Sequence, residues 1–150
     1  MDVTPEIFDA LENAWSSKDV VALTALFTPD CLYEDLALGA RHEGHAGVRE
    51  FAEAVFATMP DFTLRFPIRV VTAERGSAHW TISAHWNGPF EGVDRTGHPI
   101  VFHGLSSYLF RDGKIAHNID CWDYVAMIRA FGVLPLELSK LPTAESFALR

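Results

Sequence analysis

VFHGLSSYLFRDGKIAHNIDCWD, residues 101–123, says most about the architecture of this chain. Asp112-Gly113 stands between two runs rich in β-branched and aromatic residues. This dipeptide is typical of a two-residue hairpin turn, because both central positions of such a turn need positive φ. The stretch is therefore predicted to form two antiparallel strands, with Arg111 opposite Lys114.

The predicted register places one set of side chains on a single face of this hairpin. Residues that lie directly opposite each other on antiparallel strands point to the same side of a sheet. Counting outward from the turn predicts three such pairs on one face: Asn118 with Ser107, Asp120 with Leu105, and Trp122 with His103. A carboxylate beside an imidazole among apolar neighbours can act as an acid/base centre. This face is therefore the candidate site.

Size and composition favour a single soluble domain. A chain of 150 residues with 49% hydrophobic residues is most simply one domain with an ample core. The net charge of −8 argues against nucleic acids and anionic membranes as partners, because both need basic patches. The sequence has no apolar run of transmembrane length and no signal-peptide pattern, and two cysteines do not make a disulfide framework. We therefore expect a cytoplasmic protein.

Hydrophobic periodicity divides the chain into an N-terminal helical part and a C-terminal part made of strands. The predicted elements are helices at 5–15, 20–27, 48–59 and 124–131, and strands at 31–38, 62–70, 78–86 and in the hairpin, with a polar loop at 39–47. Pro67 predicts an edge position or a bulge for its strand. Segregated helices and strands indicate an α+β fold, and a sheet that curls around the helices would leave a cone with an apolar pocket inside.

Several motifs occur in order over residues 5–135. They are HAGVREF at 45–51, MPDF at 59–62, GPFEG at 88–92, FRDGKI at 110–115, Asp120, Asp123 and IRAFGVLP at 128–135. Together they resemble the SnoaL-like polyketide cyclases of the nuclear transport factor 2-like superfamily. The resemblance implies a cone-shaped α+β domain over residues 1–135, with the N-terminal helices packed in a curved antiparallel sheet, and a tail or arm at 136–150. It also implies a homodimer, which we expect to form through the outer face of the sheet.

The activity implied by the resemblance is an aldol-type ring closure on a hydrophobic, polyketide-like small molecule, with no cofactor. One aspartate assists this reaction in the family, and it corresponds to Asp120. Ketosteroid isomerases of the same superfamily carry their base in a Glu-Asp pair on the first strand, where Glu34-Asp35 stands here. Their oxyanion-hole residues do not carry over, because Leu11 and Ser106 occupy the corresponding places.

Carbon-acid chemistry needs a base near the acidic hydrogen and donors that hold the enolate charge. Burial raises the pKa of a carboxyl group, so a buried Asp120 could both take and give a proton near neutral pH. His103 would share that proton, Asn118 would donate to the enolate, and Asp35 is a second candidate acid/base. Asp123 is more simply the N-cap of the last helix.

The other candidate substrate-binding residues are expected at the pocket wall: Trp122, Tyr33, Trp15, His85, Phe56 and Leu105. Either face of the strand that carries Trp80 could line the pocket. No metal site is expected, because His42 and His45 lack the further ligands that a metal needs. Two alternatives stay open: an isomerase or dehydratase that relies on His85 or His103, and a ligand-binding module without turnover.

Overall fold

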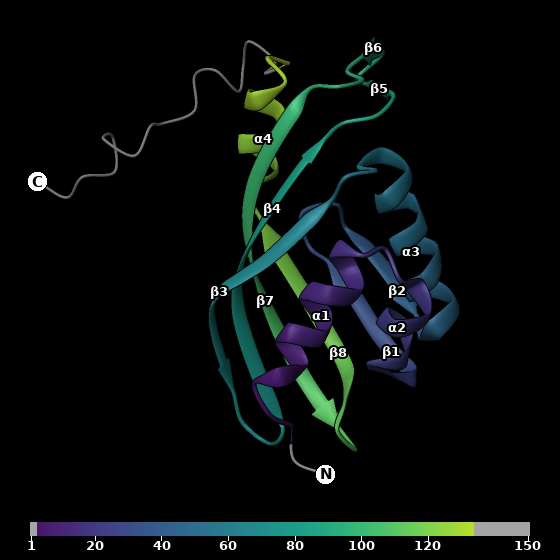
Figure 1. The fold of residues 1–150 in the computed structure, drawn as a ribbon, viewed down its shortest axis with the longest axis vertical. Coiled ribbons are helices and arrows are strands. Elements are labelled where there is room, and N and C mark those ends of the chain that lie inside the picture. The colour runs from purple at the N-terminus through teal and green to yellow at the C-terminus, as the bar shows by residue number, and fades with distance from the viewer. Residues whose placement is uncertain (1–2, 134–150) are drawn as a thin grey trace, which may run out of the picture.

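A curved six-stranded sheet and four helices make up the part of the chain that the computed structural model describes, residues 3–133 (Figure 1). In chain order the elements are α1 (Glu6–Ser16), α2 (Val20–Ala25), β1 (Phe27–Asp35), β2 (Ala40–Glu43), α3 (Gly44–Thr58), β3 (Thr63–Val71), β4 (Arg75–His85), β5 (Pro89–Phe90), β6 (Val93–Asp94), β7 (Pro99–Arg111), β8 (Lys114–Trp122) and α4 (Tyr124–Ala130). The strand order is β2-β1-β8-β7-β4-β3, and β5 and β6 form a separate small hairpin. The predicted α+β fold is confirmed, but the sheet is mixed instead of wholly antiparallel, because β1 pairs parallel with β8.

Helix α1 lies across the concave face of the sheet, and α3 covers the end formed by β1 and β2 (Figure 1). The side chain of Phe8 in α1 is fully buried. Its ring packs edge-on against Phe66 of β3 and Tyr108 of β7, with centroid distances of 5.3 and 5.4 Å. Aromatic contacts of this geometry add to the free energy gained by burying apolar area. They hold α1 against two strands that are far apart in the sequence.

Helix α2 begins with an aspartate cap. The backbone of Asp19 is extended, and its carboxylate accepts a hydrogen bond from the backbone N–H of Ala22 at 2.9 Å. We expect Asp19→Ala to lower the free energy of unfolding by about 1 kcal/mol, because this N–H loses its acceptor. Urea denaturation followed by circular dichroism measures the change, and Asp19→Asn, which keeps an acceptor oxygen, is the matched control. An Asp19→Ala protein as stable as the wild type would contradict the capping role.

The first strand starts earlier than the sequence pattern predicts. β1 begins at Phe27, where a helix is predicted, and it runs through Pro29. Phe27 pairs with Ile115 of β8, and the register then shifts before pairing resumes at Leu32. Proline has no N–H to donate, which interrupts the ladder at this point. Pairing with a distant strand therefore extends β1 beyond its local preference.

The predicted polar loop at 39–47 contains a strand and the start of a helix. β2 pairs antiparallel with β1, with His42 opposite Tyr33. Helix α3 begins at Gly44, four residues before its predicted start. A strand of four residues is too short to show a periodic pattern, so β2 has no clear signal in the sequence.

Pro67 marks both an edge strand and a bulge, as predicted. β3 is at the edge of the sheet, and its pairing with β4 shifts register between Arg65 and Ile68. The bulge turns the rest of the strand over. Phe66 stays buried, whereas Ile68 and Val70 are 64% and 65% exposed. Within the strand predicted at 62–70, regular alternation of buried and exposed residues therefore ends at the proline.

The turn of the β7–β8 hairpin is as predicted, but its register is not. Asp112 and Gly113 both have positive φ, and Arg111 lies opposite Lys114. Phe110 pairs with Ile115, and Leu109 then pairs with His117, which leaves Ala116 as an extra residue. This bulge moves every later pair by one position. Asp120 consequently lies opposite Ser106 instead of Leu105.

The hairpin leads directly into α4. Asp123 accepts a hydrogen bond from the backbone N–H of Ala126 at 2.8 Å, so its predicted role as the N-cap is confirmed. The predicted domain end at residue 135 and the tail at 136–150 lie outside the described residues.

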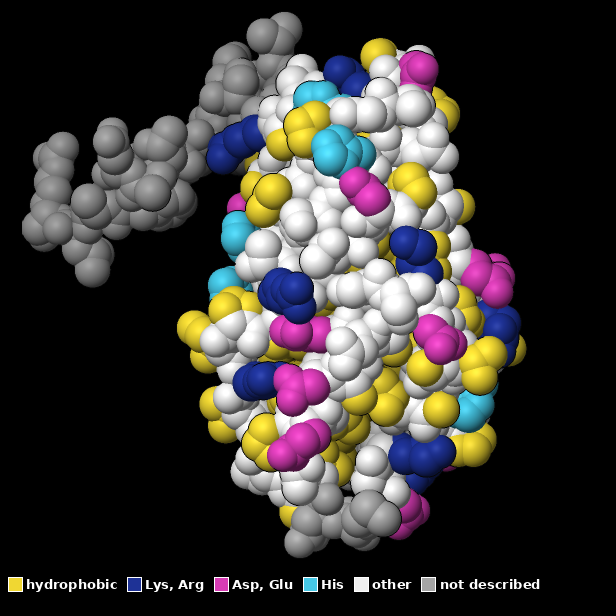
Figure 2. Space-filling view, viewed as in Figure 1, with side chains coloured by type: hydrophobic (Ala, Val, Ile, Leu, Met, Phe, Trp, Pro, Cys, Tyr) yellow, Lys and Arg dark blue, Asp and Glu magenta, His cyan; other side chains and the backbone are white. Residues whose placement is uncertain are grey.

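The surface over α1 and β3 carries mixed charge. Figure 2 shows acidic and basic side chains interspersed on the visible face. Two ion pairs join these elements: Arg65 lies 3.4 Å from Glu12, and Arg69 lies 2.5 Å from Asp9. Exposed pairs of this kind contribute little to stability.

The outer face of the sheet exposes several large apolar side chains on β3 and β7: Ile68, Val70, Val101, Leu105 and Leu109. The expected homodimer through this face stays a prediction, as does the cytoplasmic location. Among residues 3–133, no helix is both long and apolar enough to cross a membrane.

Candidate active site

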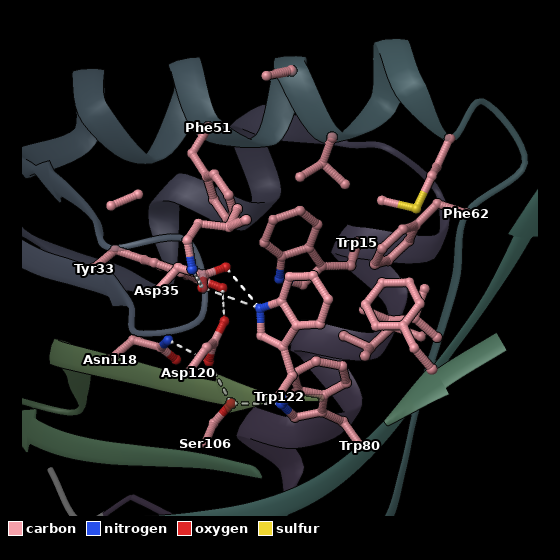
Figure 3. A pocket seen from close by; sticks show the side chains of 18 of the residues that line it. Trp15, Tyr33, Asp35, Phe51, Phe62, Trp80, Ser106, Asn118, Asp120 and Trp122 are labelled. Carbon is pink, nitrogen blue, oxygen red and sulfur yellow. Dashed lines mark hydrogen bonds between the residues drawn. The ribbon is translucent and has the colours of Figure 1, made fainter. Parts of the chain in front are cut away.

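A cavity of about 490 Å³ lies between the concave face of the sheet and helices α1 and α3. Its wall consists mainly of apolar side chains. Figure 3 shows that the polar groups gather at one end, around Asp35 and Asp120, while Trp15 and Phe62 lie at the other. Small-molecule pockets commonly measure roughly 300–1,000 Å³ and combine apolar walls with a few placed polar groups. The cavity therefore has the size and lining of a small-molecule site.

Asp120 is at the centre of the polar end. It is 8% exposed, and its carboxylate accepts hydrogen bonds from three side chains that lie on three neighbouring strands. Ser106 on β7 donates through Oγ at 2.5 Å, and Asn118 on β8 donates through Nδ2 at 2.7 Å. The hydroxyl of Tyr33 on β1 donates to the other carboxylate oxygen. The pairing of β8 with both β7 and β1 brings these donors together.

Trp80, at the far end of this network from Asp120, determines which groups donate and which accept. The indole N–H of Trp80 donates to Ser106 Oγ at 2.8 Å, and an indole nitrogen can only donate. Ser106 therefore accepts from Trp80 and directs its own proton at Asp120. With an amide and a phenol also donating, three donors converge on Asp120, and the network is arranged around an ionised carboxylate.

A second carboxyl group, Asp35, lines the same cavity from the end of β1. It is 4% exposed. The indole N–H of Trp122 lies 3.1 and 2.9 Å from its two oxygens, and the backbone N–H of Leu38 donates at 2.9 Å. The neighbouring Glu34 points the other way, where it contacts His117 at 2.6 Å. Of the Glu-Asp pair, Asp35 is thus the inward residue.

The sequence profile of one known family, the SnoaL-like polyketide cyclases, matches residues 6–131. The chain belongs to this family. SnoaL-like polyketide cyclases are lyase- or isomerase-type enzymes, and the cavity is the candidate active site of such an enzyme. No curated protein matches the chain significantly.

Solved structures share the fold of this SnoaL-like chain. A SnoaL-like polyketide cyclase from Agrobacterium tumefaciens is 22% identical, with a TM-score of 0.72 over 88% of this chain and 100% of that one. IdmH from Streptomyces antibioticus is 24% identical, with a TM-score of 0.76 over 85% and 97%. A protein from Catenulispora acidiphila with a ketosteroid isomerase-like fold is 20% identical, with a TM-score of 0.74 over 90% and 98%. Likeness at this level of identity shows the cone-shaped fold.

Burial governs the titration of this SnoaL-like site. It raises the pKa of Asp120, and the nearby Asp35 acts in the same direction, whereas the three hydrogen bonds act in the opposite direction. Burial also raises the pKa of Tyr33 well above its ordinary value, and the negative charge of Asp120 adds to this effect. Tyr33 is therefore a protonated donor at neutral pH.

The raised pKa of Asp120 predicts how stability depends on pH. The folded protein holds this proton more tightly than the unfolded chain does. The resulting stabilisation is complete below the ordinary pKa of 3.8 and is lost as the pH rises through the raised value. We expect the wild type to lose stability relative to Asp120→Asn, which cannot ionise, as the pH rises from 3.8 through the raised pKa of Asp120. Urea denaturation of both proteins across this range measures the difference. The opposite trend would show that the three hydrogen bonds outweigh burial.

Six of the predicted site residues line the cavity: Asp120, Asp35, Asn118, Trp122, Tyr33 and Trp15. The polar ones are gathered at one end of the cavity, and Trp15 lies toward the other (Figure 3). The strand that carries Trp80 turns its Trp80 face to the cavity. Asn118 is predicted to donate to an enolate, but in the structure its amide donates to Asp120. The catalytic and binding roles of these residues stay predictions.

His103 and Leu105 do not share the face of Asp120, so this part of the prediction is wrong. The bulge at Ala116 moves the register by one residue, and both side chains consequently point to the outer face. His103 Nδ1 lies 3.0 Å from the hydroxyl of Thr81, away from the cavity. An acid/base pair of Asp120 with His103 is therefore excluded by geometry.

The predictions that His85 and Phe56 line the cavity are also wrong. His85 lies on the outer face of β4, where its Nδ1 is 2.6 Å from Asp61. Because Trp80 faces the cavity, strand alternation places the side chain of His85 on the opposite face of β4. Phe56 packs behind the wall, edge-on against Trp15 and Phe62 at 5.6 and 6.2 Å. The preceding residues of α3, Ala54 and Val55, line the cavity instead.

Ser106, Tyr108 and His42 line the cavity but are missing from the predicted site. The predicted register placed Leu105 on the inner face, so strand alternation placed Ser106 and Tyr108 on the outer face. The observed register reverses these positions. The Ser106-Ser107 pair is the one available signal, since one of two adjacent strand residues always faces inward. His42 lies on β2, the strand with no clear periodic signal.

Proposed function

We propose that this chain is a cyclase that closes a ring in a hydrophobic, polyketide-like small molecule by acid/base chemistry of the aldol type. Asp120 is the general acid/base. The observation that carries the proposal is a buried carboxylate with three oriented donors at the polar end of an apolar cavity. Family membership supports this type of chemistry.

The proposed reaction has three steps, and its protons balance. Asp120 takes a proton from the carbon next to a substrate carbonyl group, which leaves an enolate. The enolate carbon then attacks a second carbonyl carbon of the same molecule and forms the ring bond. The alkoxide produced by this attack receives the proton back from Asp120. A raised pKa suits this double role, because the same group must both take and give a proton near neutrality.

Two tyrosines flank the reacting groups. Tyr33 orients the carboxylate of Asp120 through its hydroxyl. Tyr108 lies opposite Asn118 in the sheet and lines the cavity, and burial raises its pKa, so that its phenol stays protonated. A neutral phenol in this place can donate to an enolate oxygen as charge develops there. The apolar walls exclude the water that would compete for the enolate.

A proton-exchange assay tests the acid/base step without the natural substrate. 2-Tetralone, a bicyclic ketone of suitable size, is incubated with the protein in heavy water, and NMR follows deuterium uptake at the carbons next to the carbonyl group. We expect uptake well above the buffer rate with the wild type and uptake at the buffer rate with Asp120→Asn. Calorimetry establishes that the ketone binds both proteins. Binding without faster exchange would overturn the proposed chemistry.

A further inference from the structure

The cavity is acidic, although its walls are apolar. Among the described residues that line it, Asp35 and Asp120 carry carboxyl groups, none is lysine or arginine, and His42 is the single basic side chain. In the described part of the chain, no basic side chain lies within 4.0 Å of either carboxyl group. Buried charges in proteins are usually paired, and an unpaired one is costly. Within residues 3–133, neither carboxyl group therefore has a positively charged partner in direct contact.

Asp35 receives fewer hydrogen-bond donors from the described residues than Asp120 does. A carboxylate has about four lone-pair sites for hydrogen bonds. Those of Asp120 receive three donors, all from side chains. Asp35 receives only the indole N–H of Trp122, shared between its oxygens, and the backbone N–H of Leu38. It keeps capacity for a further donor from the cavity side.

Aromatic rings surround the same end of the cavity. Trp122 contacts Asp35 through its indole N–H, and Tyr33 and Phe51, whose ring centroids are 4.9 Å apart, line the same cavity. The faces of aromatic rings attract cations, and an ammonium group gains most when it is removed from water. A carboxylate among aromatic rings thus favours a positive group and disfavours a negative one.

We propose that the cavity selects for charge: it takes a ligand with an apolar body and an ammonium group, which binds at Asp35, and it rejects carboxylates. The apolar body occupies the aromatic end, and the ammonium group donates to the free positions of Asp35. This inference concerns the same cavity as the proposed reaction but does not depend on turnover.

Three naphthalene probes of nearly equal size test the proposal by calorimetry at neutral pH: 1-naphthylmethylamine, 1-naphthylmethanol and 1-naphthoate. We expect the amine to bind at least tenfold more tightly than the alcohol, and the naphthoate to bind more weakly than the alcohol. Asp35→Asn should bring the amine to within about threefold of the alcohol and leave the affinity of the alcohol unchanged. These expected ratios follow from the energy of a partly desolvated ion pair.

Glu34→Gln is the matched control. It removes one negative charge from the adjacent position, but its side chain points away from the cavity toward His117. All three affinities should therefore stay as in the wild type. Equal affinities, a preference for naphthoate, no binding of the amine, or an amine preference that survives Asp35→Asn would each overturn the proposal. The wild-type ranking decides the question even if Asp35→Asn fails to fold. Since the measurement is binding, its outcome is independent of the exchange assay.

Discussion

Asp120→Asn is expected to lower the rate of catalysed proton exchange by about 10²- to 10⁴-fold, the range that a positioned general acid/base contributes. Asparagine fills the same space and keeps one acceptor oxygen, so it can accept from Ser106 or from Tyr33 but not from both, because these two donate to different oxygens of Asp120. Its amide cannot take a proton from carbon. The loss should fall on kcat, because the apolar walls that bind the substrate are unchanged. Exchange of 2-tetralone protons in heavy water, measured at several ketone concentrations, separates kcat from KM.

The chain offers a matched control for this substitution three residues later. Asp123 caps α4 through the backbone N–H of Ala126 and does not line the cavity. Asparagine is as good an N-cap as aspartate, so Asp123→Asn should change neither the exchange rate nor the stability appreciably. A folded Asp120→Asn protein with the wild-type rate would remove Asp120 from the mechanism.

Gly104→Ala is expected to destabilise the fold by about 3 kcal/mol, at the upper end of the range for overpacked cores. A Cβ atom at this position would lie 2.1 Å from Cζ2 of Trp80, and two further atoms of the same ring would lie at 2.5 and 2.6 Å. The indole therefore rests directly on the backbone of β7. It can accommodate a methyl group only by moving away from Ser106, which would lose its hydrogen-bond donor.

A double-mutant cycle isolates this clash. Trp80→Phe shortens the side chain, so the cost of Gly104→Ala should be clearly smaller in the Trp80→Phe background than in the wild type. Urea denaturation of the four proteins gives the coupling free energy. Equal costs in both backgrounds would show that the contact between Trp80 and Gly104 does not limit this position. Because Ser106 links Trp80 to Asp120, Gly104→Ala should also slow proton exchange.

Features that depend on residues close together in the chain were predictable. The Asp112-Gly113 turn, the Asp19 and Asp123 caps and the bulge at Pro67 all follow from local backbone chemistry. The inward position of Asp120 and of Asn118 was also predicted, although the partners of Asp120 on β7 and β1 were not. The burial of Asp120 in the structure confirms this prediction, which followed from the alternation of inward and outward residues along β8.

The neighbours of Asp120 depend on one inserted residue. Ala116 forms a bulge three residues beyond the turn, and no residue near it marks the position as glycine or proline would. A slip of one residue exchanges the two faces of a strand. It replaces Leu105 by Ser106 at the side of Asp120 and turns His103 outward. The predicted imidazole partner was therefore lost, and a serine took its place.

Local pattern thus established the class of fold, the hairpin and the presence of an acidic group on its inner face, since each of these depends on residues a few positions apart. The surroundings of that acid came from contacts between distant segments. β1 lies parallel to β8 and delivers the Tyr33 hydroxyl, while the packing of Trp80 against Gly104 orients Ser106. Such neighbours are set by strand pairing and by the filling of the core, and neither quantity is encoded in any short stretch of the chain.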